Sequence, residues 1–313
     1  MRRGSPITLK QLRYFIAIAE AGSFSAAARN AYIAQPALSR QISLLEEELG
    51  MQLLERLHDG ILLTDSGQRL CDLARFVVQT VDSLKSELHS TQDNPKGMVT
   101  IAIPVTASAL LMPLIIIQAR EKFPGIELVV RDGLSQETGE AIAMGQVDFG
   151  VTPNAEELDH VCVDPVFAEH LYWVGQHACP ETADTITLTQ AAASSLAMLP
   201  KNCSYLRRRA EQAAIQLGIE LNVVYEQHTA QGLSSLVRSG LAATICNWPA
   251  VREGSPYPPL MIVEPRLYRT ISIAHSAHKP LSFAASCIRD LVRGMLVEAV
   301  RSGNWSGELI KHP

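Results

Sequence analysis

Long hydrophobic runs are missing from this sequence of 313 residues. No apolar stretch approaches the roughly 20 consecutive residues that a helix needs to span a bilayer. Near the N-terminus, Lys10, Arg13 and Glu20 interrupt the apolar residues, so the hydrophobic core of a signal peptide does not form. We therefore expect a cytoplasmic protein without a membrane partner.

Cysteine is scarce and scattered. The six cysteines form no close pair; they are Cys71, Cys162, Cys179, Cys203, Cys246 and Cys287. Disulfide frameworks and zinc sites need cysteines at short spacings, so neither is expected, and the thiols should be reduced and mostly buried. His275 and His278 have a spacing that suits two ligands on a helix, but they lie in an expected strand, so no metal is predicted.

Catalytic motifs are missing as well. The sequence has no G-x-S-x-G nucleophile elbow, no P-loop and no G-x-G-x-x-G fingerprint after a strand. No grouping of serine, histidine and aspartate is readable either. We therefore predict neither a catalytic residue nor a cofactor.

The net charge of −5 does not suggest a nucleic-acid-binding protein, but the charge is unevenly distributed. Residues 1–45 contain six arginines and lysines against one acid, Glu20, whereas residues 46–313 contain 21 basic and 31 acidic residues. A basic N-terminal segment followed by an acidic body is compatible with binding of a nucleic acid by the N-terminal segment.

Residues 23–49 predict a helix-turn-helix. Ser23 is a suitable N-cap for a short helix over residues 24–31. A turn follows at residues 32–34, and Pro36 then fits the first turn of a longer second helix, where its missing N–H is not needed. Such a pair of helices places the second helix in a DNA major groove.

The second of these helices has two different faces. Apolar residues recur on one face, which must pack on a core: Leu38, Ile42, Leu45 and Leu49. The other face carries Gln35, Ser39 and Arg40. Glutamine pairs with adenine, arginine with guanine or phosphate, and serine with phosphate, so this face suits a DNA groove. The alternative is a polar, solvent-facing helix side in some other bundle.

Residues 51–64 predict a wing after this helix. Two short extended runs flank Asp59-Gly60, a dipeptide that favours hairpin turns. Arg56 on this hairpin is then placed to reach a phosphate or the minor groove.

A long helix is expected from residue 65 to residue 92. Apolar residues recur in it at spacings of four and three, namely at Leu70, Ala74, Val77, Val81, Leu84 and Leu88. This heptad pattern predicts a two-helix dimerisation stalk, which would set two recognition helices at a fixed spacing. The alternative is a helix packed on its own domain. Residues 93–97, DNPKG, end the helix and form a hinge.

From residue 98 to residue 313, strands and helices alternate, beginning with a strand over residues 99–103 and ending with a helix over residues 281–300. Such alternation predicts parallel sheets covered by helices. The segment is longer than one compact sheet usually needs, so we expect two lobes with a cleft between them.

Several longer stretches are characteristic: GSFSAAA at 22–28, QPALSRQISLLEEELG at 35–50, PLIIIQAREKFPGIEL at 113–128 and MGQVDFGV at 144–151, with LLER and LLTDSG around the wing. Together they resemble the LysR-type transcriptional regulators over essentially the whole chain. IAQPALS and the segment LPKNCSYLRRRAE at 199–211 are also similar to the nitrogen assimilation control branch of that family.

The resemblance implies an α+β protein in four segments. These are a winged helix-turn-helix DNA-binding domain (1–64), a linker and dimerisation helix (65–92), a hinge (93–97) and a two-lobed α/β effector domain like a periplasmic binding protein (98–313). The expected function is sequence-specific DNA binding and transcriptional regulation as a dimer or tetramer. Double-stranded promoter DNA, further copies of the chain, a small-molecule effector and RNA polymerase are the candidate partners.

The family motif implies a set of DNA contacts: Ser23, Gln35, Pro36, Ser39, Arg40 and Arg56. Two positions depart from the family pattern. Ala34 stands where Ser or Thr usually precedes Gln-Pro, and His58-Asp59 stands where the wing tip is usually basic. Both departures predict a weaker nonspecific electrostatic grip on DNA.

The resemblance also implies a small, often anionic, effector between the lobes. The matching positions are Thr106, Ser108, Ser135, Pro200 and Thr244. Free N–H groups and the dipole at a helix N-terminus favour an anion there, although Thr106 and Ser135 also suit the role of simple helix N-caps. The three arginines at 207–209 are either a cation for the effector or a solvated face.

Three alternatives stay open at this stage. A regulator of the nitrogen assimilation branch needs no small effector, in which case the cleft is vestigial. An enzyme on the two α/β lobes, and a small-molecule-binding protein without a DNA role, are the alternatives from other functional classes. The second of these leaves the first 90 residues unexplained.

Overall fold

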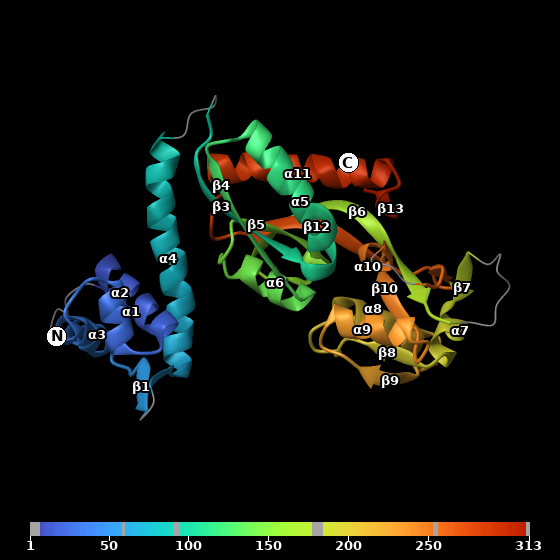
Figure 1. Ribbon diagram of the computed structural model, residues 1–313, viewed down its shortest axis with the longest axis horizontal. Helices are drawn as coiled ribbons and strands as arrows, with labels where there is room; N and C mark the ends of the chain where they lie inside the picture. Colours follow the sequence, from blue (N-terminus) through green and yellow to red (C-terminus); the bar gives the residue numbers. More distant parts are fainter. Residues whose placement is uncertain (1–6, 58–59, 90–93, 177–183, 253–255, 311–313) are drawn as a thin grey trace. The chain divides into compact units, whose positions relative to one another are not determined.

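The structure is a computed structural model that describes residues 7–57, 60–89, 94–176, 184–252 and 256–310. The chain forms two compact units, Met1–His89 and Ser90–Pro313 (Figure 1). In the described part of the chain, no helix combines the length and the apolar character needed to cross a membrane.

The first unit is a winged helix-turn-helix with one long additional helix. Its elements are α1 (Leu9–Ala21), α2 (Phe24–Asn30), α3 (Gln35–Leu49), β1 (Leu54–Leu57), β2 (Gly60–Leu63) and α4 (Asp65–His89). Ser23 caps α2, since its hydroxyl accepts the N–H of Ala26 at 3.2 Å. Ala34 precedes α3 and supplies no side-chain cap, as the sequence predicts.

The core of this unit lies where α1, α2 and α3 meet. Leu38, Ile42 and Leu45 of α3 are buried against Phe15 and Ile18 of α1. The predicted core-facing side of α3 is therefore confirmed, and the opposite side faces outward. Strands β1 and β2 form the predicted antiparallel hairpin, with Leu54 opposite Leu63.

Helix α4 packs on α1. Ala74 is buried, and Leu70 packs against the core formed by α1, α2 and α3. Arg75 forms an ion pair with Glu20 of α1 at 3.3 Å, and Arg13 pairs with Asp82. The first two positions of the predicted heptad seam therefore serve their own domain, which was the alternative interpretation of this helix.

The second unit consists of two lobes. The first lobe contains β3 (Gly97–Pro104), α5 (Val105–Lys122), β4 (Ile126–Gly133), α6 (Ser135–Ala143), β5 (Phe149–Pro153), a 3-10 turn (Ala155–Glu157), β12 (Tyr268–Ser276), α11 (Phe283–Arg301) and β13 (Gly307–Leu309). The second lobe contains β7 (Thr185–Thr187), α7 (Leu188–Ala193), β8 (Leu196–Met198), α8 (Tyr205–Gln216), β9 (Val223–Glu226), α9 (Ala230–Arg238), β10 (Thr244–Asn247) and β11 (Leu260–Val263). Helix α10 (Trp248–Arg252) follows β10, and its Trp248 packs against the core of the first lobe.

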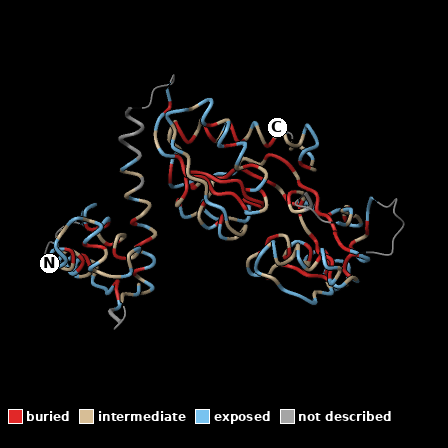
Figure 2. The backbone as a smooth tube through the Cα atoms, viewed as in Figure 1, coloured by how far each residue is buried: buried red, intermediate tan, exposed pale blue. Residues whose placement is uncertain are grey.

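Strand β6 (Val161–Val174) runs through both lobes. Its first part pairs with β12, and its last part pairs with β10 and β11. Each lobe has its own hydrophobic core, and buried backbone follows the strands of both (Figure 2). The two lobes are thus separate packing units that share one strand.

The sheets are mixed and not purely parallel as the alternation of elements predicted. β3 is parallel to β4 and β5, whereas β12 is antiparallel to both β5 and β6. β12 brings the chain back from the second lobe to the first beside β6, and it therefore runs in the opposite direction to β6. The first half of β6 contains Asp164-Pro165, and a proline within a strand obscures the strand pattern in the sequence.

Candidate nucleic-acid interface and effector cavity

The outward side of α3 gathers the predicted DNA contacts. Gln35, Pro36 and Arg40 are exposed and Ser39 is half-buried. The backbone of Arg56 lies in β1 opposite Ile61, while its side chain and residues 58–59 fall outside the described part of the chain. Gln35, Pro36, Ser39 and Arg40 therefore all lie in the first turns of the helix and are not part of its buried side.

Two further residues at this surface were missed by pattern analysis. Ser25 of α2 donates a hydrogen bond from Oγ to Oε1 of Gln35 at 3.3 Å. Tyr32 stands in the turn with 94% of its surface exposed, and its φ of 53° lies in the left-handed region. A fully exposed aromatic ring beside a recognition helix was available from the sequence, but nothing in the local pattern marked it as exposed.

A cavity of about 110 Å³ lies between the two lobes of the second unit. The first lobe contributes Thr106 and Ser135, and the second lobe contributes Thr244 and Asn247. Nδ2 of Asn247 donates a hydrogen bond to Oγ1 of Thr106 at 3.2 Å, so the lobes are joined at the cavity wall.

Two helices begin at this cavity. Thr106 is the second residue of α5, and Ser135 is the first residue of α6. The N-caps of these helices are Pro104 and Leu134, and neither gives a side-chain cap. Thr106 and Ser135 are therefore not simple N-caps, and the free N–H groups of both helices lie at the cavity wall.

Two of the predicted effector residues lie away from the cavity. Ser108 is buried inside the first lobe, where its Oγ lies 4.0 Å from Sδ of Met112. Pro200 is buried in the second lobe, and its carbonyl accepts the N–H of Cys203 at 3.2 Å and its thiol at 3.3 Å. Both residues differ from Thr106 and Ser135 in that neither lines the cavity.

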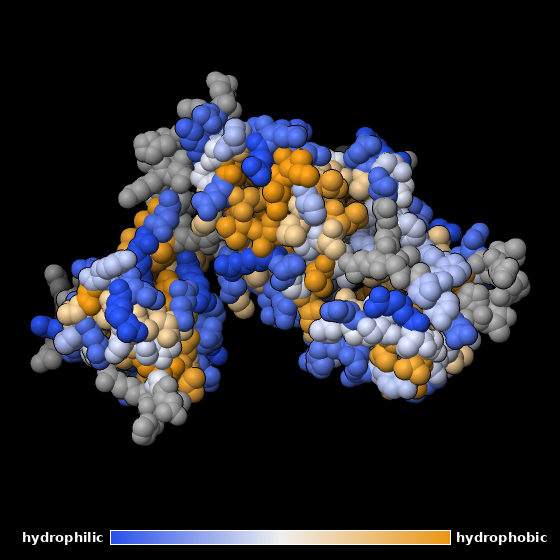
Figure 3. Space-filling model, viewed as in Figure 1, coloured by the Kyte–Doolittle hydropathy of each residue, from blue (hydrophilic) through white to orange (hydrophobic). Residues whose placement is uncertain are grey.

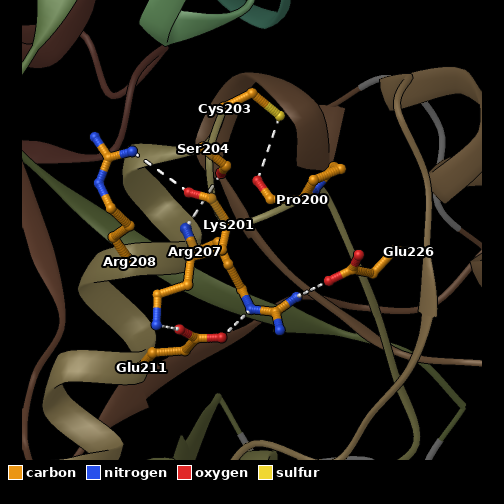
Figure 4. Close-up of polar contacts among 8 residues, drawn as sticks. All are labelled: Pro200, Lys201, Cys203, Ser204, Arg207, Arg208, Glu211 and Glu226. Atoms are coloured by element: carbon orange, nitrogen blue, oxygen red, sulfur yellow. Dashed lines mark hydrogen bonds and ion pairs between the residues drawn. The ribbon is translucent and has the colours of Figure 1, made fainter.

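The three arginines at 207–209 do not line the cavity either. Arg207 is buried and binds Glu211 at 2.6 Å and Glu226 at 3.6 Å (Figure 4). Arg208 stacks on the ring of Tyr205 at 4.3 Å, with further bonds from its guanidinium to Lys201 and Gln136. The run is thus neither a ligand cation nor a uniformly solvated face.

The cation that does line the cavity is Arg269 of β12, with Arg238 as a second, more exposed one. Arg269 is buried and donates from Nε to Oε2 of Glu169 at 2.6 Å. Oε1 of Glu169 accepts the indole N–H of Trp305 at 2.7 Å. Sequence analysis missed this group because its members are far apart in the chain.

Four of the described thiols are held in their neutral form. Burial raises the pKa of Cys203, Cys71 and Cys287, and it raises the pKa of Cys246 to about 12. Thiols that react rapidly with oxidants have lowered pKa values, so these four cysteines have the character of structural residues. Cys179 lies outside the described residues.

His275 and His278 do not share a helix face: His275 lies in a strand, and His278 follows the end of that strand. His275 lies in β12, and burial and the nearby Arg289 lower its pKa. The ring of His278 lies 5.0 Å from that of His160 instead. Among the described residues, no group of three or more metal-ligating side chains is found.

Comparison with protein families identifies the two units. The model of the LysR substrate binding domain matches residues 92–296, and that of the bacterial regulatory helix-turn-helix protein, lysR family, matches residues 9–68. The chain belongs to the LysR family. It is a DNA-binding transcriptional regulator with an effector-binding domain, and not an enzyme.

Several LysR-family relatives match nearly the whole chain. The nitrogen assimilation regulatory protein nac of Klebsiella aerogenes is 27% identical over 295 residues, covering 93% of this chain and 95% of that protein. The hydrogen peroxide-inducible genes activator of Haemophilus influenzae is 28% identical over 301 residues, covering 93% and 99%.

Solved structures share the fold. A full-length OxyR variant from Pseudomonas aeruginosa has a TM-score of 0.72 at 22% identity, covering 99% of this chain and 100% of that chain. Full-length CbnR complexed with its target DNA has a TM-score of 0.53 at 24% identity, covering 92% and 99%. The predicted architecture, a winged helix-turn-helix followed by a two-lobed α/β domain, is confirmed.

Proposed function

We propose that this LysR-type regulator binds promoter DNA through Ser23, Gln35, Pro36, Ser39, Arg40 and Arg56, and that a small molecule in the cavity between the lobes controls its activity. The observation that carries the DNA-binding part is the outward surface of α3, where Gln35, Pro36 and Arg40 are exposed above a buried apolar face. Glutamine and arginine on such a surface reach base edges in the major groove. Cytoplasmic location follows from DNA binding.

We propose that two copies of the chain associate through α4, which sets the spacing of their two helix-turn-helix domains. Leu73 and Val77 are exposed apolar residues on α4, one turn apart, and Val81 continues the same side of the helix. Leu84 and Leu88 of the predicted seam have side chains outside the described residues. We therefore assign the contact between two stalks to the stripe Leu73, Val77 and Val81, in place of Leu70 and Ala74, which are used within the head.

A second apolar surface supports assembly beyond the dimer. Leu114 and Ile117 of α5 are exposed although the other side of this helix is buried in the core of the first lobe. Apolar side chains gather over α5 in Figure 3. A contiguous exposed apolar surface is typical of a protein–protein contact, and a tetramer built from two dimers uses both surfaces.

The effector we propose is anionic. The N-termini of α5 and α6 meet at the cavity, and the charged side chains on its wall, Arg238 and Arg269, are both cationic. Helix N-termini and guanidinium groups bind carboxylates and phosphates. A vestigial cleft is the alternative, in which case no anion changes operator binding.

The relatives suggest two regulatory roles, in nitrogen assimilation and in the response to hydrogen peroxide. Burial raises the pKa of Cys203 and Cys246, so neither thiol has the lowered pKa of a cysteine that reacts rapidly with oxidants. We propose a role in nitrogen metabolism, by analogy with the nac relative. Its partners are promoter DNA, further copies of itself, the small effector and RNA polymerase.

The experiment that tests the proposed function is genome-wide mapping of binding sites, with and without nitrogen limitation. Sites upstream of genes for nitrogen uptake or assimilation, occupied differently in the two conditions, are the expected result. Binding sites that show no relation to promoters would contradict DNA-dependent regulation. Promoter sites whose occupancy ignores nitrogen supply would contradict the nitrogen role alone.

A further inference from the structure

A buried ion pair lies on the wall of the cavity, where β6 and β12 cross between the lobes. Arg269 and Glu169 are direct neighbours across these two strands. The side chain of Arg269 is 6% exposed and that of Glu169 is fully buried. One carboxylate oxygen of Glu169 accepts Nε of Arg269 at 2.6 Å, and the other accepts the indole N–H of Trp305 at 2.7 Å. Both oxygens are therefore engaged.

This arrangement fixes the orientation of the guanidinium group. Among the described residues, Arg269 makes one side-chain hydrogen bond, and it leaves through Nε. The two Nη groups remain as donors on a residue that lines the cavity. The planar guanidinium matches the two oxygens of a carboxylate, and a fixed guanidinium loses little freedom when it binds one.

The same cavity contains a second donor in need of an acceptor. Oγ1 of Thr244 is buried and has no hydrogen-bond partner among the described residues. Thr244 is 7% exposed and lines the cavity together with Arg269. Buried hydroxyl groups are nearly always hydrogen-bonded, so a bound ligand is the natural partner for this one.

The remaining wall is mainly apolar. Leu134 closes the cavity from the first lobe, and Met198, Leu233 and Val237 close it from the second. The volume of about 110 Å³ is somewhat smaller than the roughly 150 Å³ of an apolar cavity that holds benzene. Among the described residues, none that lines this wall carries a carboxylate, so a cationic ligand would find no partner there.

We propose that Arg269 and Thr244 bind the carboxylate of a small effector whose apolar body lies against Leu134, Leu233 and Val237. Glu169 and Trp305 are positioning residues that act through Arg269. The ligand class is a small monocarboxylate of roughly six non-hydrogen atoms, with a short aliphatic or cyclic body. This inference rests on the proposed effector control and adds the residues and the chemistry that recognise the effector.

The test uses the full-length chain and three pairs of probes: butyrate, isobutyrate and cyclobutanecarboxylate, each against its primary amide. Isothermal titration calorimetry measures the affinity of each. We expect at least one carboxylate to bind tenfold more tightly than its amide. Arg269→Gln should bring that carboxylate to the level of the amide, and Arg269→Lys should restore part of the preference. Equal binding of acid and amide, no binding of any acid, or an unchanged preference in Arg269→Gln would overturn the proposal.

The positioning role has its own readout, the ratio of carboxylate to amide affinity. Trp305→Phe keeps the aromatic body and removes the hydrogen bond to Glu169, so this ratio should fall severalfold. Trp173→Phe is the matched control, because it removes a comparable indole hydrogen bond, at 2.9 Å to Ser194, away from Arg269. Equal ratios in the two variants would show that Trp305 has a structural role only.

An electrophoretic shift of promoter DNA by the wild-type chain without any carboxylate tests the proposed DNA function separately.

Discussion

The hydroxyl of Ser25 donates a hydrogen bond to Oε1 of Gln35 at 3.3 Å, which ties the first turn of α2 to the first residue of α3. With its oxygen engaged by Ser25, Gln35 retains its amide N–H₂ group as a donor to a base or a phosphate. The helix-turn-helix therefore contains a residue that orients a DNA contact without being one of the predicted contacts itself.

Ser25→Ala should weaken operator binding through Gln35. We expect a smaller loss than for Gln35→Ala, because the amide remains but is free to rotate. Fluorescence anisotropy with a labelled promoter fragment measures both variants, and Ser302→Ala is the control for loss of a hydroxyl in the other unit. In a Gln35→Ala background, Ser25→Ala should cost nothing further. An undiminished effect in that background would show that Ser25 acts on DNA directly.

Arg40→Ala should lower specific affinity by about 1–3 kcal/mol and relax the preference at one base pair, if Arg40 reads a base edge. Selection of preferred sites from a randomised operator shows whether one position loses its preference. Arg120→Ala, at an exposed position of α5, is the control for loss of a positive charge. An equal loss on all sequences would instead identify Arg40 as a phosphate contact.

Tyr32→Ala should weaken DNA binding with little change in the free energy of unfolding of the first unit. The side chain is 94% exposed, so its removal opens no cavity in the core. Its position in the turn, next to the first turn of α3, makes the phenol available to the DNA backbone. Urea unfolding followed by circular dichroism checks stability beside the binding assay. Unchanged affinity would show that the ring serves another surface.

Leu73→Glu or Val77→Glu should give monomers that remain folded, because both side chains are exposed on α4. Val81→Glu should also give monomers with weak operator affinity. Ala74→Glu should instead unfold the first unit, since the side chain of Ala74 is buried there. Light scattering gives the oligomeric state and circular dichroism gives the fold. An unchanged oligomer in Leu73→Glu and Val77→Glu would refute this stripe as the contact.

Glu211→Gln should make the stability of the second unit less dependent on acid pH. Burial raises the pKa of Glu211, but hydrogen bonds from Lys201 at 2.7 Å and Arg207 at 2.6 Å lower it further than burial raises it, so the net pKa lies below its ordinary value of 4.5. A lowered folded-state pKa adds stability above pH 4.5, which is lost as the pH falls through the folded-state pKa.

The difference in unfolding free energy between wild type and Glu211→Gln should therefore be largest at neutral pH and shrink in acid. Tryptophan fluorescence reports this unit alone, because the three tryptophans, Trp173, Trp248 and Trp305, all belong to it. A difference that is the same at pH 7 and in strong acid would contradict the ion pairs as the cause.

Part of this molecule follows from local sequence pattern, and part does not. Leu38, Ile42 and Leu45 mark the buried side of α3, because a helix buries residues at fixed local spacing. Three strands, β7, β11 and β13, were not predicted, since strands of three or four residues are too short for a period to be read. Glu169 and Arg269 are 100 residues apart and meet only because β6 and β12 pair.

The heptad seam shows a different limit. Leu70 and Ala74 fit the pattern of a stalk, but the same apolar character also suits packing on α1. Pattern gives the apolar side of a helix and does not say which partner covers it. The site in the second unit shows the same limit, since Thr106, Ser135 and Thr244 line the cavity while Ser108 and Pro200 do not.

Salt-dependent binding to the promoter next to its own gene tests the central claim most directly. Fluorescence anisotropy of that fragment, at about 50 and 200 mM salt, should show specific binding that weakens steeply as salt rises, because arginine and lysine contacts to phosphates release counterions. The slope of log affinity against log salt should flatten in Arg40→Ala only if that residue contacts a phosphate. Binding to no promoter-sized fragment near the gene at either salt concentration would contradict the assignment of α3 as a DNA-reading helix.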